Sequence, residues 1–171
     1  MSKCKREGYD EAPFFYVEAG SETPYAVAWL PGRLEELVTG LLRHWPRRLD
    51  VHVEVLDEDF EEVEFDAFGD IGREKLLKVL AAHAETAFGD GGVRFRIWRR
   101  ETDKEHCLGL DEHGVLHVWE EPEQVRAWLK GAGIEERRAE LVDDDEHWHE
   151  TPEDSDLKRE RFLDALQLKS S

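Results

Sequence analysis

The side chains best suited to chemistry gather in one acidic stretch, residues 143–150. This stretch carries Asp143, Asp144, Asp145, His147 and His149. Carboxylates and imidazoles together suit zinc, manganese or iron, and His147 and His149 would point the same way in an extended chain. A catalytic metal would need further ligands from elsewhere. We interpret the stretch as a solvated connector with no tightly held metal or other cofactor, and keep a metal site at His147 and His149 as the alternative.

Three more histidines, His106, His113 and His117, surround a predicted hairpin. In the expected register His106 faces inward and His117 faces outward, which disfavours a joint site. Cys107 follows His106 directly, and adjacent residues of a strand point to opposite faces, so the two do not form a nucleophile pair. We interpret these histidines as ordinary strand positions and Cys107 as a buried thiol.

The glycine-rich segment at residues 89–92 resembles a phosphate loop, but it leads from a predicted helix into a strand. Phosphate loops run from a strand into a helix, whose N-terminus meets the phosphate. The segment is therefore a helix cap and turn. The sequence contains no nucleophile elbow, zinc-protease motif or Walker motif either, and we assign no catalytic residue.

The chain has 171 residues and a formal net charge of −18, which two segments account for. Residues 54–70 and residues 140–156 each hold nine acids and neither Lys nor Arg. Such a field repels phosphate backbones, which argues against direct nucleic-acid binding. It attracts basic proteins and speeds their encounter. The alternative is that these acids only keep the protein soluble.

Aromatic and arginine side chains at positions predicted to face solvent offer anchors for a partner protein, because Trp and Arg dominate the binding energy of protein interfaces. The predicted partner-binding residues are Glu61, Glu62, Glu64, Trp98, Trp119, Asp143, Asp144, Asp145 and Trp148. Arg94, Arg96 and Trp98 share one predicted strand. A small-ligand site on that strand is an alternative interpretation.

Hydrophobic periodicity predicts an α+β fold. An apolar run over 25–30, bounded by Pro24 and Pro31, predicts one strand. Apolar residues alternate in strands near 51–55, 63–65 and 93–97, and recur at helical spacing over 34–45 and 76–88. The resulting β-α-β-β-α-β order over residues 25–98 predicts a ferredoxin-like split core. Its wet sheet face would carry His52, Glu54, Glu62, Glu64, Arg94, Arg96 and Trp98.

Beyond residue 98 the pattern predicts further elements: a β-hairpin over 108–119, a short helix from Pro122, a possible strand over 139–142 and an amphipathic helix over 157–168. The expected organisation is a lead-in at 1–12, one α+β domain at 13–142, an acidic connector at 143–156 and a C-terminal helix at 157–171. The helical spacing of apolar residues over 34–45 places Leu41 and Trp45 on the inner face of that helix.

Two cysteines make no disulfide framework, and no apolar run approaches the roughly 20 residues of a membrane span. With no visible targeting segment, we expect a cytoplasmic protein, and its excess of Arg over Lys favours a bacterial source. Its oligomeric state is not fixed by the sequence.

We therefore expect a non-catalytic acidic protein-binding module, such as an inhibitor, immunity factor or adaptor, that docks a basic partner in an intracellular bacterial system. The alternatives are a metal-dependent hydrolase or nuclease-like enzyme using His147 and His149, and a small-ligand sensor using Arg94, Arg96 and Trp98.

Overall fold

A computed structural model describes residues 4–5, 12–18, 25–57, 59, 62–99, 106–138, 148–149 and 151–170. The strands are β1 (Cys4–Lys5), β2 (Phe14–Glu18), β3 (Tyr25–Trp29), β4 (Arg48–Leu56), β5 (Val63–Gly72), β6 (Val93–Arg99), β7 (Cys107–Leu110), β8 (Val115–Trp119), β9 (Glu135–Glu136), β10 (Trp148–His149) and β11 (Lys169–Ser170). The helices are α1 (Leu34–Leu42), α2 (Arg73–Ala82), α3 (Ala84–Gly89), α4 (Pro122–Gly131) and α5 (Ser155–Leu166).

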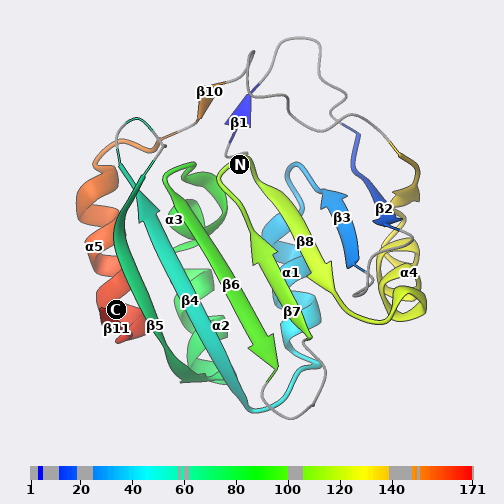
Figure 1. Cartoon of the computed structure of the whole chain (residues 1–171), viewed down its shortest axis with the longest axis horizontal. Coiled ribbons are helices and arrows are strands. Elements are labelled where there is room, and N and C mark those ends of the chain that lie inside the picture. Colours follow the sequence, from blue (N-terminus) through cyan, green and yellow to red (C-terminus); the bar gives the residue numbers. More distant parts are fainter. Residues whose placement is uncertain are drawn as a thin grey trace.

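One large sheet dominates the molecule (Figure 1). Its strand order over the described residues is β11-β5-β4-β6-β7-β8-β3-β2-β9, and β1 pairs separately with β10. Neighbouring strands are antiparallel except for β2 and β9, which are parallel. Short strands at both edges offer little unpaired backbone to other chains.

All five helices contribute to one core on one face of the sheet. In β4 the buried side chains of Val51, Val53 and Val55 alternate with half-buried polar ones, as expected for a strand with one face in the core. These valines share a core cluster with buried residues from every helix, such as Phe88 of α3 and Phe162 of α5. The opposite face of β4 and β6 carries polar side chains.

The α+β class and the β4–β5 hairpin are confirmed, since Val55 pairs antiparallel with Phe65 and Val53 with Ala67. The elements from residue 25 to residue 98 also follow the predicted order, with the second helix split in two. A ferredoxin-like split core is not confirmed. In the sheet β4 lies between β5 and β6, and β7 and β8 separate these strands from β3.

Two helices differ in detail from the sequence prediction. In α1 Leu42 is fully buried, whereas Leu41 is only half-buried. The second predicted helix is interrupted at His83, whose φ of −120° and ψ of 32° separate α2 from α3. The break lets α3 direct Phe88 against Phe95, with ring centroids 6.0 Å apart in an edge-to-face contact. The predicted strand at 139–142 lies outside the described residues.

A buried ion pair fixes α5 to the body of the domain. Arg159 of α5 donates from Nε to Asp90 Oδ2 at 2.7 Å and from Nη2 to Asp90 Oδ1 at 2.8 Å. The Asp90 side chain is fully buried and also accepts the backbone N–H of Gly92 at 2.8 Å. A Cβ at Gly92 would lie 2.7 Å from Arg159 Cζ, so only glycine leaves room for this guanidinium.

No helix in the described ranges is long and apolar enough to cross a membrane.

Replacing Arg159 by Met should lower the free energy of unfolding by about 3–5 kcal/mol, because Asp90 would keep a buried charge without its partner. Arg161→Met is the matched control on the same helix, where Arg161 is exposed, and should change stability by no more than about 0.5 kcal/mol. Urea unfolding measures both. Equal losses in the two variants would contradict the role of the ion pair.

Gly92→Ala should destabilise the wild-type protein by displacing the Arg159 guanidinium, and should cost much less in the Arg159→Met background. The two positions touch, so their effects should be non-additive. A double-mutant cycle measured by urea unfolding tests this coupling, and simple additivity would rule it out.

Leu42→Ala should lower the free energy of unfolding by about 2–5 kcal/mol as a fully buried truncation. Leu41→Ala, one residue away in the same helix, should cost clearly less because Leu41 is half-buried. Thermal or urea unfolding of the pair reads out which face of α1 is inside, and the reverse ranking would show that the helix is rotated.

Candidate functional site

The acids of the 54–70 segment meet those of α5 in a groove of about 680 Å³. Its lining consists of Val55, Asp57, Asp59, Glu64, Phe65, Asp156, Arg159, Glu160, Leu163 and Asp164. The groove thus joins two segments separated by about a hundred residues of sequence, and six of its ten residues are carboxylates. We refer to it below as the acidic groove.

Local geometry explains why these side chains converge. Asp156, Glu160 and Asp164 are spaced four apart, so they project from one face of α5. On the sheet side, Phe65 pairs with Val55 while Val63 pairs with Leu56. This register shift leaves Glu64 as the extra residue of a β-bulge, a feature that redirects a side chain. Glu64 therefore lines the acidic groove.

Arg159 is the one cation lining the acidic groove among the residues described. Its hydrogen bonds to Asp90 raise the pKa of the guanidinium above its ordinary value, an effect that burial opposes and that the charges of Asp90, Asp156 and Glu64 reinforce. Arg159 therefore stays charged, but its charge is matched by Asp90 beneath it. The net field of the groove is strongly negative.

The predicted partner-binding residues are only partly brought together. Glu62 and Glu64 are exposed, and Glu64 lines the acidic groove. Glu61, Asp143, Asp144, Asp145 and His147 lie outside the described residues, and Trp148 is placed only by its backbone in β10. Sequence reasoning missed Glu160 and Asp164, although their spacing from Asp156 is a signal of a shared helix face.

The predicted wet face is largely confirmed on β4 and β6. His52 lies opposite Arg96, and Glu54 lies opposite Arg94. Arg94 Nε is 2.7 Å from Glu54 Oε2, and Arg94 Nη1 is 3.6 Å from Glu112 Oε2. Two carboxylates therefore compensate Arg94, while Arg96 remains exposed.

The predicted ligand-binding residues of β6, Arg94, Arg96 and Trp98, do not line one common cavity. A cavity of about 280 Å³ is lined by Arg94 and Arg96 with Trp119. Trp119 stacks on Tyr25, with ring centroids 5.9 Å apart. Trp98 instead packs between other rings, 6.3 Å from His52 and 6.2 Å from Phe68. The two arginines thus lack the aromatic neighbour that the sequence suggested, and Trp119 takes its place.

His106 and His117 lie on opposite faces of the sheet, as predicted. The His106 Nδ1 lies 2.7 Å from Glu120 Oε1 on the helix side, where Arg99 also binds Glu120 at 2.9 Å. On the open face the His117 Nε2 lies 3.1 Å from Asp111 Oδ2. Cys107 is buried.

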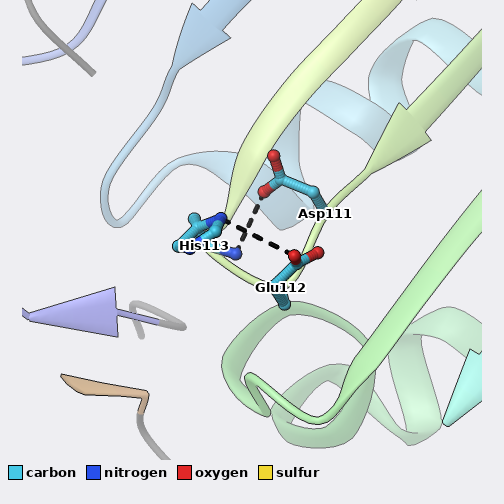
Figure 2. A group of neighbouring side chains, drawn as sticks. All are labelled: Asp111, Glu112 and His113. Carbon is cyan, nitrogen blue, oxygen red and sulfur yellow. Dashed lines mark hydrogen bonds and ion pairs between the residues drawn. The ribbon is translucent and has the colours of Figure 1, made fainter. Parts of the chain in front are cut away.

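Among the described residues, metal-binding side chains gather closely enough to hold an ion at the β7–β8 turn. Asp111, Glu112 and His113 cluster there (Figure 2), with one potential ligand atom from each within 4.8 Å of the others. His149 lies beside this cluster, its ring centroid 5.1 Å from that of His113. The turn, and not the acidic connector alone, is therefore where metal-binding side chains meet.

Comparison of the chain with models of known protein families, with curated proteins and with solved structures gave no match.

Proposed function

We propose that this protein is a non-catalytic module that docks a basic partner protein through the acidic groove. The observation that supports this most is the composition of the groove: six carboxylates from two distant segments surround one arginine, which Asp90 already neutralises. A surface of this kind attracts a cationic partner and disfavours an anionic one.

The apolar floor of the groove suits the side chains that such a partner would present. Val55, Phe65 and Leu163 lie among the carboxylates. Lysine and arginine carry an aliphatic stem below a charged head, so the stems can cover the floor while the heads meet the acids. A peptide segment with several Lys or Arg residues matches both features.

The proposed role is that of an inhibitor, immunity factor or adaptor in the cytoplasm of a bacterium. The second acidic block would extend the docking surface through Asp143, Asp144 and Asp145, with Trp98, Trp119 and Trp148 as anchors. The acidic groove is the part of this surface for which side-chain geometry supports the proposal. Arg94, held between two carboxylates, makes the small-ligand alternative at Arg94, Arg96 and Trp98 the weaker one.

The proposal predicts that charge reversal in the groove slows association. The triple variant Asp156→Lys, Glu160→Lys and Asp164→Lys should reduce the association rate about tenfold or more at low salt, because the groove steers the encounter. The effect should shrink at physiological salt, where exposed charges are screened within about 8 Å. Surface plasmon resonance with a lysine- and arginine-rich peptide, and then with a partner captured from a bacterial lysate and purified, measures these rates.

The matched control is Glu35→Lys, Glu74→Lys and Glu123→Lys, the same change in net charge at exposed sites on three other helices. A control that slows association equally would show a general field effect and not a docking groove. Two further charge-reversal variants complete the test, one at Glu61, Glu62 and Glu64 and one at Asp143–Asp145. If neither of these nor the groove variant changes the association rate, the acids serve solubility and the proposal fails.

A further inference from the structure

Hydrogen bonds to the side chain of Asp111 shape the β7–β8 turn. Asp111 Oδ1 accepts the backbone N–H of His113 at 3.0 Å and that of Val115 at 2.8 Å. Gly114, with a φ of +80°, returns the chain into β8. Asp111 Oδ2 also lies 3.1 Å from His117 Nε2. Asp111 is thus occupied in shaping the turn, and the side chains of Glu112 and His113 project beside it (Figure 2).

His149 reaches this turn from β10, far along the chain. Its Nδ1 lies 3.3 Å from the backbone carbonyl oxygen of Glu112. A carbonyl oxygen only accepts, so Nδ1 carries the proton and the lone pair of the neutral imidazole lies on Nε2. Histidines that bind metals typically donate their second ring N–H to a backbone carbonyl or carboxylate in this way.

Glu112 is shared between two neighbours by its two oxygens. Its Oε2 faces Arg94 Nη1 at 3.6 Å, and its Oε1 lies 3.9 Å from His113 Nδ1. Arg94 is also bound by Glu54 at 2.7 Å. Glu54 and Glu112 therefore share this one guanidinium, and the negative charge of Glu112 is only partly neutralised. One oxygen of Glu112 therefore remains directed toward the imidazole of His113.

We propose that His113, His149 and Glu112 bind one Zn²⁺ ion, with Asp111 as a positioning residue. His149 lies beside the cluster of Asp111, Glu112 and His113, and its ring would move toward Glu112 and His113 when the ion binds. Two imidazoles and one carboxylate match the ligand preferences of zinc. Three protein ligands leave a further position for water or for a group of another molecule. The ion would tie the β10 segment to the β7–β8 turn, and the site differs from one made by His147 and His149.

Isothermal titration of the full-length protein with Zn²⁺ tests this proposal. The wild type should bind about one ion per chain, and His113→Ala and His149→Ala should each weaken binding tenfold or more. Glu112→Gln keeps the shape of the side chain and should also weaken binding. Co²⁺ should give the intense visible bands of a tetrahedral site in the wild type and lose them in these variants.

His44→Ala and His147→Ala are the controls, and both should bind Zn²⁺ as the wild type does. His44 is exposed at the end of α1, distant from the turn in sequence. Unfolding measured in EDTA should be unchanged in the Glu112→Gln variant, which separates loss of metal from loss of fold. The proposal is overturned if the wild type binds no stoichiometric zinc, if the His113→Ala, His149→Ala double variant still binds it, or if binding depends on His147 and not on His113.

Discussion

The contact between Asp90 and Arg159 determines where the last helix lies, and the acidic groove depends on that placement. Asp90 is fully buried at the turn between α3 and β6, and Arg159 reaches it from α5 with two hydrogen bonds. A bidentate pair fixes direction as well as distance, so it orients α5 about its own axis. That orientation turns Asp156, Glu160 and Asp164 toward the strand that carries Glu64.

The one-sided sheet explains why the remaining candidate side chains stay accessible. The helices pack on one face (Figure 1), and the polar residues of β4 and β6 face the other way. Near β2 and β3 this second face becomes apolar, with Phe14, Val27, Trp29 and Val115 buried together. There Arg137 stacks on Phe14 at 4.7 Å, and burial raises the pKa of neighbouring Tyr16. The open face thus divides into an apolar end and a charged end.

The sequence predicted elements well where one residue pattern decides the outcome. Alternation in β4 specifies a buried face, and that face lies in the core as expected. The predicted C-terminal helix is present as α5. The order of strands depends instead on contacts between distant segments, which local patterns do not encode. The insertion of β7 and β8 between β6 and β3 could not be deduced from periodicity.

In the candidate sites, too, local patterns predict some features, whereas others depend on contacts between distant segments. Glu160 and Asp164 were detectable by their spacing, but their position opposite Glu64 requires a β-bulge and a buried ion pair. The approach of His149 to His113 depends on the pairing of two very short strands, β1 and β10. Two-residue strands carry no periodic signal, so this neighbourhood is visible only in the folded chain.

Magnitudes indicate that the acidic face of α5 is not a device for stability. Like charges four residues apart on a helix destabilise it by about 0.2–0.5 kcal/mol for each pair, and α5 has two such pairs among Asp156, Glu160 and Asp164. Burial of Phe162 and Leu166 on the opposite side contributes roughly 1.5–3 kcal/mol each, so the helix docks in spite of the repulsion. Under the proposed function, this repulsion would be a small loss of stability accepted for binding. A solubility role alone would be met equally well by the same acids dispersed over the surface, where they would repel one another less.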